Sequence, residues 1–330
     1  MTGGDTANPA AGQRSAKLIE VDDKSEGQRI DNFLVRVMKG VPKTRIYKAL
    51  RKGEVRVNSK RVNARYALRL GDKVRIPPIR VSAEGPPKTL PDGFQDQIEI
   101  LHEDDDLMVI NKPTGLAVHG GTGQRIGLIE GLRLLRPQSS YLELVHRIDR
   151  ETSGCLMIAK SRMSLLKLQS QLTSSTMEKH YTALMCGCPP DEHIRIDHGL
   201  AQKKQASGRK RMVIDRNGQH ALTVFRRLEC VGDFAFVSAR IHTGRMHQVR
   251  VHAQALGHPL AGDDLYGDFS RNKQLRKYGL KRLFLHARKL HLKHPTGNRD
   301  LVVEAPLPCD LSRCLQHLRD MQLNAISDDV

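Results

Sequence analysis

Apolar residues near the start of the chain recur with the period of a helix. Ile30, Phe33, Leu34 and Val37 fall on one face of a helix that begins after Arg29. Most of the residues between them are polar or charged. This pattern predicts an amphipathic helix that buries one side.

A second helix and two short strands complete this first region. Pro42 ends or restarts the helical run, and a second helix is predicted from Thr44 to Arg51, with Thr44 as a candidate N-cap. Gly53 supplies its C-terminal stop. The alternating patterns at 54–58 and 72–76 predict two strands. The region is therefore expected to form a small α/β module.

From residue 98 onward, apolar runs of strand length alternate irregularly with short helices. We expect a helix at 163–172 and strands at 107–113, 142–146, 154–160, 180–185, 221–225 and 234–240. Strands outnumber helices, and no regular strand–helix alternation occurs. This indicates an α+β domain whose mixed sheet is mostly antiparallel.

Four segments follow from these patterns. Residues 1–16 are small and polar and are predicted to form a flexible tail, and residues 17–80 form the small module. Residues 81–96 are rich in Pro and Gly and are predicted to be a linker. Residues 97–330 form the larger domain, which is long enough for a sizeable core.

Positive charge is concentrated in the small module. The chain of 330 residues has a formal net charge of +18. Residues 27–76 hold fifteen Lys or Arg and three Asp or Glu, a local charge of +12. A uniformly solvated surface would spread its charge more evenly, so this concentration favours a partner that carries many phosphates.

The composition argues against several classes of protein. No run approaches the roughly 18 apolar residues of a membrane span and no apolar signal segment opens the chain, so we expect a cytoplasmic protein. None of the six cysteines forms Cys-x-x-Cys, and three lie in apolar surroundings, as core thiols of a reducing cytosol do. His286, His291 and His294 match no metal motif, and a structural role is favoured for them.

Asp149 is the leading candidate for a reacting group. It lies in the segment His146-Arg147-Ile148-Asp149-Arg150, on a loop between two predicted apolar strands. Active sites often place a reacting side chain on a loop that a rigid scaffold holds. Taken alone, however, an aspartate in a turn is usually structural.

Two nucleotide-binding interpretations fail on spacing. Kinase catalytic loops share His-Arg-x-Asp, but no Asp-Phe-Gly follows here and no Asn stands five residues after Asp149. The segment Gly120-Gly-Thr-Gly123 lacks the Lys-Ser/Thr that completes a P-loop. The sequence therefore favours neither a kinase nor a P-loop protein.

Ordered motifs resemble those of two known families. The S4 RNA-binding domain is resembled at residues 29–34, 45–58 and 70–74. The segment from His146 to Gly154 resembles the defining motif of the RluA family of pseudouridine synthases. Later motifs of that family are resembled in order at 179–181, 244–252, 257–259, 263–267 and 282–287. Met246 and Val249 depart from the family's usual residues, but neither change removes a reacting group.

The resemblance implies a pseudouridine synthase fold and an enzyme that turns uridine in RNA into its C-glycoside isomer, with no cofactor and no metal. It implies that Asp149 is the catalytic carboxylate acting on a flipped-out uridine and that Arg250 pairs with it. We expect that contact to be bidentate. Tyr181 would stack on the uracil and help to remove its C5 proton, and Val249 would form the opposite wall. Whether Asp149 attacks C1′ or promotes a glycal intermediate stays open.

Basic and polar residues are expected to bind the RNA. The resemblance implies that Arg147 fills the space left by the flipped base, while Arg245, His247 and the basic run at 203–211 hold flanking phosphates. His146 and seven residues of the small module complete the set of candidates: Lys43, Arg45, Lys48, Arg51, Lys52, Arg56 and Asn58.

The resemblance further implies 23S large-subunit ribosomal RNA as the substrate, modified at several sites by a monomer. Transfer RNA and other ribosomal sites stay open. Two other classes remain to be weighed. A ribosome-assembly factor would bind RNA without chemistry, although Asp149, Tyr181 and Arg250 are all present. A glycoside hydrolase would need a second carboxylate, for which Glu151 is the only nearby acid, and it would not explain the basic module.

Overall fold

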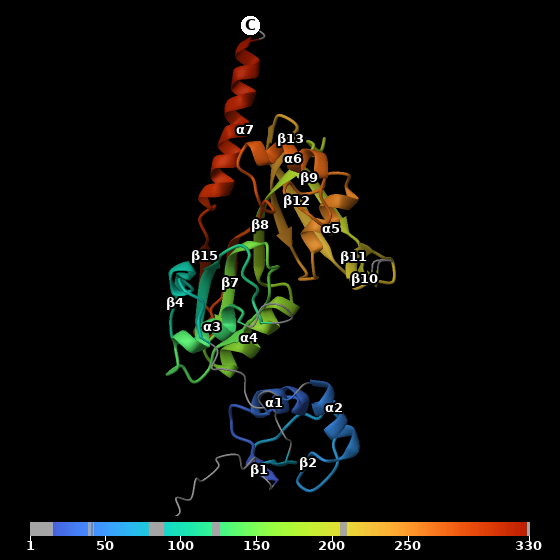
Figure 1. Cartoon of the computed structure of the whole chain (residues 1–330), viewed down its shortest axis with the longest axis vertical. Helices are drawn as coiled ribbons and strands as arrows, with labels where there is room; N and C mark the ends of the chain where they lie inside the picture. Colours follow the sequence, from blue (N-terminus) through green and yellow to red (C-terminus); the bar gives the residue numbers. More distant parts are fainter. Residues whose placement is uncertain are drawn as a thin grey trace, which may run out of the picture. The chain divides into compact units, whose positions relative to one another are not determined.

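The computed structural model describes residues 16–38, 41, 43–78, 89–120, 126–204 and 210–328, without the side chains of residues 43, 44, 210 and 325–328. The chain divides into two compact units, Met1–Thr89 and Leu90–Val330, which are coloured in sequence order in Figure 1. Pro42, the predicted tail apart from residue 16, and residues 81–88 of the predicted linker lie outside the described residues.

The small unit packs two helices on a three-stranded antiparallel sheet of order β1-β3-β2. Its elements are β1 (Lys17–Glu20), α1 (Ile30–Val37), α2 (Lys43–Lys52), β2 (Arg56–Val57) and β3 (Lys73–Ile76). Ile30, Phe33 and Leu34 are buried and Val37 packs against the same core, so the predicted apolar face of the first helix is confirmed. The second helix begins one residue before Thr44, which therefore lies inside the helix and not at its N-cap.

The large unit begins earlier than the predicted domain boundary. Phe94 is 4% exposed and belongs to the core of the large unit. Its ring lies so close to Gly131 that a Cβ there would meet it at 2.1 Å. One aromatic side chain thus anchors the end of the predicted linker 81–96 to the large unit, and residues 90–96 cluster with that unit.

A ten-stranded mixed sheet frames the large unit. Eight strands follow the order β4-β5-β7-β14-β8-β13-β12-β9, while β15 pairs with β14 and β6 with β7. Among the described strand pairs of this sheet only β7 and β14 run parallel, so the mostly antiparallel mixed sheet is confirmed. The strands are β4 (Glu99–Glu103), β5 (Leu107–Lys112), β6 (Glu143–Leu144), β7 (Ser153–Ala159), β8 (Glu178–Cys186), β9 (His193–Asp197), β12 (Leu222–Val231), β13 (Phe234–Ile241), β14 (Leu285–Lys293) and β15 (Asp300–Glu304).

Short helices accompany this sheet, and the long helix α7 extends away from it (Figure 1). The helices are η1 (Gln95–Gln97), α3 (Leu128–Leu135), α4 (Arg162–Thr173), α5 (Gln248–Ala255), α6 (Phe269–Lys277) and α7 (Cys309–Asp328). Two of them start at side-chain caps, Ser161 for α4 and Asp268 for α6. No helix in the described part of the chain is long and apolar enough to cross a membrane.

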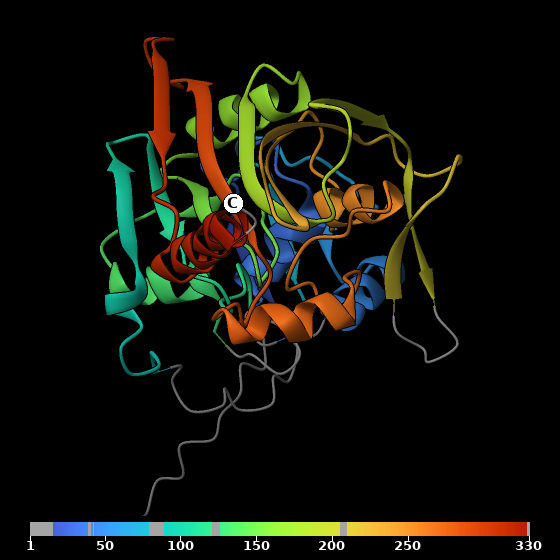
Figure 2. The same ribbon diagram turned by 90° about the horizontal axis from the view of Figure 1, so that it is seen from above.

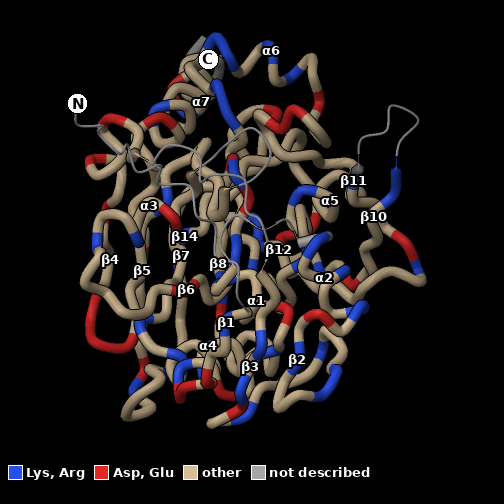
Figure 3. The backbone as a smooth tube through the Cα atoms, turned by 60° about the horizontal axis from the view of Figure 1, so that its bottom comes forward, with Lys and Arg blue, Asp and Glu red and all other residues tan. Residues whose placement is uncertain are grey.

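A two-stranded hairpin stands out from the large sheet, as Figure 2 shows from above. It consists of β10 (Leu200–Lys204) and β11 (Lys210–Ile214), which form a separate two-stranded sheet. Lys and Arg residues lie at the outer ends of both strands (Figure 3). Leu200 at its base and Met212 midway along β11 are buried in a small apolar cluster with Tyr266. The hairpin therefore combines a basic outer end with an apolar base.

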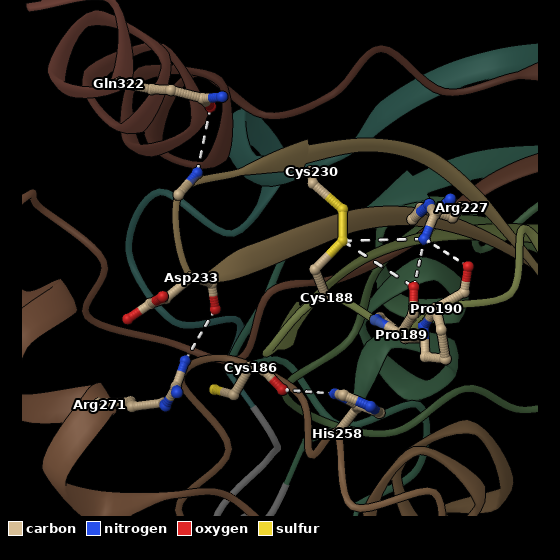
Figure 4. The surroundings of a disulfide bond; sticks show 11 residues. Cys186, Cys188, Pro189, Pro190, Arg227, Cys230, Asp233, His258, Arg271 and Gln322 are labelled. Carbon is tan, nitrogen blue, oxygen red and sulfur yellow. Dashed lines mark hydrogen bonds between the residues drawn. A yellow bond between two sulfur atoms is a disulfide. The ribbon is translucent and has the colours of Figure 1, made fainter. Parts of the chain in front are cut away.

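The cysteines divide into a bonded pair and free thiols. Cys155, Cys186 and Cys314 are buried and free, as expected for core thiols. Cys188 and Cys230, however, form a disulfide between the segment after β8 and the end of β12 (Figure 4). The sequence analysis did not predict this pair, because residues 42 positions apart meet only through the pairing of the intervening strands.

Candidate active site

Asp149 lies on the turn that leads into β7. The backbone N–H of Thr152 donates to the carbonyl of Asp149 at 3.2 Å and closes the turn. Immediately after it, β7 starts beside β14, and Gly154 pairs with Ala287. A Cβ on Gly154, whose φ is +108°, would lie 2.3 Å from the carbonyl oxygen of Ala287. Glycine is thus required for the close strand contact that fixes the exit of the turn.

A fully buried lysine, Lys112, binds the backbone of the same turn. Lys112, at the end of β5, is 0% exposed. Its ammonium donates to the carbonyls of Pro113, Leu116 and Arg150 at 2.7–3.0 Å. Burial lowers the pKa of Lys112 to about 7. These three bonds tie the residue that follows Asp149 to the segment after β5.

The carboxylate of Asp149 faces two cationic or polar groups from the start of α5. Its Oδ2 lies 3.6 Å from a terminal nitrogen of Arg250 and 3.9 Å from Nε2 of His247. The Asp149 side chain is 18% exposed. These distances place an ion pair at the carboxylate but leave its oxygens room to accept a further partner.

The bidentate contact of Arg250 is with Asp263 and not with Asp149. Nε and one terminal nitrogen of Arg250 each donate to a carboxylate oxygen of Asp263 at 2.7 Å. Burial acts to raise the pKa of Asp263, but the bonds from Arg250 outweigh it and lower the pKa. The predicted bidentate pairing with Asp149 was therefore wrong. Asp263 binds Nε and one terminal nitrogen of the Arg250 guanidinium. The other terminal nitrogen of Arg250 is the one that lies near Asp149.

The candidate catalytic residues line one small pocket of about 70 Å³ that opens to solvent. Tyr181 and Val249 are 8% and 5% exposed and form apolar parts of its wall. Burial raises the pKa of Tyr181, as does the charge of Asp149, so its phenol stays protonated. The pocket is lined by Arg147, Ile148, Asp149, Thr152, Tyr181, Ile241, Gly244, Arg245, Met246, His247, Gln248, Val249, Arg250 and Leu285.

Most of the residues predicted for the large domain thus meet in the structure. Arg147 and Arg245 are exposed at this pocket, and Arg245 also donates to the carbonyl of His220 at 3.0 Å. His146 is not part of the pocket lining. Its Nε2 accepts a bond from the N–H of Met157 at 3.2 Å, and burial lowers the pKa of His146 to about 3. The geometry gives His146 a place in the scaffold behind the turn.

Comparisons with known proteins agree with this geometry. A family model described as RNA pseudouridylate synthase matches residues 106–255, and the S4 domain model matches residues 28–74. Proteins named ribosomal large subunit pseudouridine synthase C from Vibrio cholerae and Salmonella typhimurium are 44% and 46% identical to this chain. The matches cover 92% and 93% of this chain and 97% and 98% of those proteins. The chain belongs to the RNA pseudouridine synthase family.

A solved structure supports the same assignment. The human RNA pseudouridylate synthase domain containing 4 is 29% identical to the chain, with a TM-score of 0.56, and the match covers 67% of this chain and 93% of that one. The chain is thus an RNA pseudouridine synthase with an S4 domain, as the resemblance implied. The α+β fold with a leading S4 domain is confirmed.

The S4 domain of the synthase presents part of the predicted basic set. Lys48, Arg51 and Lys52 are exposed on α2, which accords with a surface for phosphates. Arg45 forms an ion pair with Glu54 at 2.7 Å. The side chain of Lys43 lies outside the described residues, as do the middle of the basic run at 203–211 and the side chain of residue 210.

Two further candidates of the S4 domain are both exposed but differ in their hydrogen bonds. Arg56 is exposed, and its Nε donates to the carbonyl of Gly53 at 3.3 Å. Asn58 lies at φ 48°, donates to Asp72 at 2.7 Å and accepts from the N–H of Lys73 at 2.8 Å. Asn58 is thereby engaged within the domain as a turn residue.

One group of side chains could offer ligands to a metal ion. Within the described residues, Asp104, Asp106 and His294 place ligand atoms within 4.8 Å of one another. These atoms already bond to protein groups, because His294 contacts Asp104 at 2.9 Å and Ser164 donates to Asp106 at 2.6 Å. None of the four lines the pocket at Asp149. The cluster is explained by its hydrogen bonds alone.

Two buried polar residues of the site were not singled out by the sequence analysis. Asp263 and Lys112 are both 0% exposed and hold Arg250 and the catalytic turn. Asp263 belongs to a segment that matched the family motifs, and Lys112 stands directly before a proline at the end of a predicted strand. A charged residue at the end of an apolar run was the available signal, but the partner that links Lys112 to the catalytic turn, Arg150, is 38 positions away.

Proposed function

We propose that this synthase converts uridines to pseudouridine at several sites of 23S large-subunit ribosomal RNA, with Asp149 as the catalytic carboxylate acting on a flipped-out uridine. The observation that carries the proposal is the pocket that joins Asp149, Arg250 and Tyr181. The choice of substrate rests on the names of its relatives, which are called ribosomal large subunit pseudouridine synthases.

The pocket offers the groups that such an isomerisation needs. The reaction breaks the C1′–N1 bond, turns the uracil and joins C5 to C1′, so nothing is added or removed overall. Asp149 can attack C1′ or assist formation of a glycal by taking the 2′ proton. Arg250 lies 3.6 Å from that carboxylate and pairs its positive charge with it.

The walls of the pocket suit a flat base. Tyr181 provides an aromatic face on which uracil can stack, a contact worth about 1–3 kcal/mol. Because its phenol stays protonated, Tyr181 can help to remove the C5 proton only by passing its own proton to another acceptor as it takes that one. Val249 supplies an apolar opposite wall, and Arg147 at the rim fills the space that the flipped uridine leaves.

Basic surfaces bring the RNA to this pocket. Arg245, His247 and the basic run at 203–211 hold flanking phosphates, and the exposed α2 residues Lys48 and Arg51 give the S4 domain a phosphate-binding face. These contacts set affinity and orientation. The identity of the modified uridine is read by the fit of the flipped base and its neighbours.

The decisive experiment replaces one carboxylate and leaves its neighbour as a control. Asp149→Asn is expected to abolish pseudouridine formation while RNA binding is retained. The matched control is Glu151→Gln, which neutralises the other acid of the same turn and is expected to keep full activity. Pseudouridine mapping of ribosomal and transfer RNA from a deletion strain carrying the wild type or each variant provides the measurement.

Each result separates this proposal from a rival. Normal modification by Asp149→Asn would remove Asp149 from the chemistry. Loss of activity in Glu151→Gln would favour a mechanism with two carboxylates. Wild-type complementation that restores pseudouridine only in transfer RNA would leave the reaction intact but overturn the proposed ribosomal substrate.

A further inference from the structure

The phenol of Tyr266 is a buried polar group to which the proposed chemistry gives no task. Tyr266 is 2% exposed. Its hydroxyl oxygen accepts a hydrogen bond from the backbone N–H of Met212 on β11 at 3.1 Å. A tyrosine hydroxyl has a single proton, and the bond from Met212 leaves that proton free for another acceptor. The acceptor within reach is Nδ1 of His247, 2.9 Å away.

This contact decides which nitrogen of His247 carries the ring proton. A neutral imidazole has one N–H, so when Nδ1 accepts from Tyr266 the proton lies on Nε2. Nε2 is the atom that lies 3.9 Å from the carboxylate of Asp149. Burial lowers the pKa of His247, and the neutral ring is therefore the form present at neutral pH. In that tautomer the N–H lies on the ring nitrogen nearest to Asp149, 3.9 Å from its carboxylate and so just beyond hydrogen-bond distance in this structure.

The backbone of His247 is held in a conformation that few residues adopt. Its φ of 55° and ψ of 20° are left-handed, at the position that precedes α5. Such strain persists only where the surroundings impose it. The ring of Tyr266 packs edge-on against the imidazole, with centroids 5.5 Å apart. Tyr266 thus contacts His247 by both its ring and its hydroxyl.

We propose that Tyr266 is a positioning residue of the synthase, which fixes the tautomer of His247 and so presents an N–H donor to Asp149. The inference rests on the proposed catalytic role of Asp149. Its consequence is that the carboxylate is oriented from two sides. Arg250, locked by Asp263, supplies a charge at 3.6 Å, and His247, locked by Tyr266, supplies a neutral donor.

The same phenol joins the pocket to the hairpin. The guanidinium of Arg211 on β11 lies 4.6 Å from the centroid of the Tyr266 ring, and that of Arg250 lies 5.0 Å from it. Met212, the hydrogen-bond donor, is the next residue of β11. Strand β11 of the hairpin is therefore part of the support for His247, in addition to any contact that the hairpin makes with RNA.

The test removes one oxygen atom. In Tyr266→Phe, kcat on an RNA substrate is expected to fall about tenfold, the factor that one ordinary neutral hydrogen bond carries, while KM stays within twofold. The matched control is Tyr278→Phe, which removes a half-buried hydroxyl that does not line the pocket. Nitrogen-15 NMR of the His247 ring reports the tautomer directly, and the Nε2–H pattern of the wild type is expected to become a mixture in Tyr266→Phe.

Each outcome decides the inference. A wild-type spectrum of the Nδ1–H form overturns it, even if Tyr266→Phe does not fold. A fall in kcat without a change of tautomer also overturns it, because the phenol would then act only through the fold. Failure of the proposed function is seen separately, since Asp149→Asn would then stay active whatever Tyr266→Phe does.

Discussion

Asp104 and Asp149 are two aspartates of the large unit with similar side-chain exposure, 24% and 18%. Asp104 accepts hydrogen bonds from the backbone N–H groups of Asp106 and Leu107 at 2.9 and 3.0 Å. The rings of His102 and His294 contact its other oxygen at 2.8 and 2.9 Å. Its carboxylate is fully engaged.

Asp149 has no such set of partners. Within the described residues its carboxylate makes only the ion pair with Arg250 at 3.6 Å and the contact with His247 at 3.9 Å. The difference teaches that exposure does not identify a reacting acid. The number of hydrogen bonds that a carboxylate already accepts separates a structural aspartate from one that can still take a substrate.

The largest expected effect comes from removing the cation beside Asp149. Arg250→Met leaves the fully buried Asp263 without its bidentate partner, so the free energy of unfolding should fall by about 3–5 kcal/mol. The activity that remains should be lower by about 100-fold or more, as for loss of a preorganised charged donor. Urea unfolding and kcat on an RNA substrate measure both. Arg245→Met, at an exposed arginine of the same pocket, is the control and should change stability by less than about 0.5 kcal/mol.

Substitution of Asp104 should lower the stability of the protein and leave its catalytic activity unchanged. Asp104→Asn weakens bonds to a charged group, and we expect the free energy of unfolding to fall by about 2–3 kcal/mol. Pseudouridine formation per folded molecule should be unchanged. Thermal unfolding and kcat are the measurements, with the exposed neighbour variant Asp105→Asn as control. A loss of kcat in folded Asp104→Asn would erase the distinction between the two aspartates.

The pH dependence of stability should also trace back to Asp104. Burial acts to raise the pKa of Asp104, but the bonds from Leu107, His102, Asp106 and His294 outweigh it and lower the pKa below the ordinary 3.8. A lowered pKa means that the unfolded chain binds the proton more tightly, so the stabilisation is complete well above pH 3.8 and is lost as pH falls.

The wild type and Asp104→Asn should therefore differ most near neutral pH. Below pH 3.8 their difference in unfolding free energy should shrink by about 1.4 kcal/mol per pH unit. Urea unfolding at several pH values between 3 and 7 is the measurement. A difference that stays constant over that range would mean that the carboxylate of Asp104 is not the group that titrates.

The smallest effect is expected where charges lie on the surface. The double variant Lys48→Gln/Arg51→Gln on α2 should reduce the slope of log affinity against log salt by about 1.4, or about 0.7 for each lost contact with single-stranded RNA. Lys24→Gln, an exposed lysine outside α2, serves as control. An unchanged slope in the double variant would show that this face of the S4 domain does not touch RNA.

Local patterns were enough to predict the elements and the family. The apolar period of Ile30, Phe33 and Leu34 gave the first helix, and the ordered motifs around Asp149, Tyr181 and Arg250 gave three residues that line one pocket. Each of these signals lies within a few consecutive residues, where periodicity and motif spacing are informative.

The remaining features depend on contacts between distant segments. Asp263 competes with Asp149 for Arg250 only because the turn before α6 returns to α5. Phe94 joins the large core through Gly131, and Cys188 meets Cys230 through the pairing of strands. No local pattern encodes these contacts, since each depends on which elements become neighbours in the folded chain.

The hydrogen bonds of the Lys112 ammonium affect which residues of the catalytic turn can be substituted. The ammonium holds the catalytic turn through the carbonyl of Arg150, by way of the main chain alone. The side chains of Arg150 and Glu151, which do not line the pocket, are exposed on that turn. They can be exchanged while the backbone that carries Asp149 stays anchored. Choice of RNA and chemistry are thereby separable, which makes this turn a tractable place for engineering new target sites.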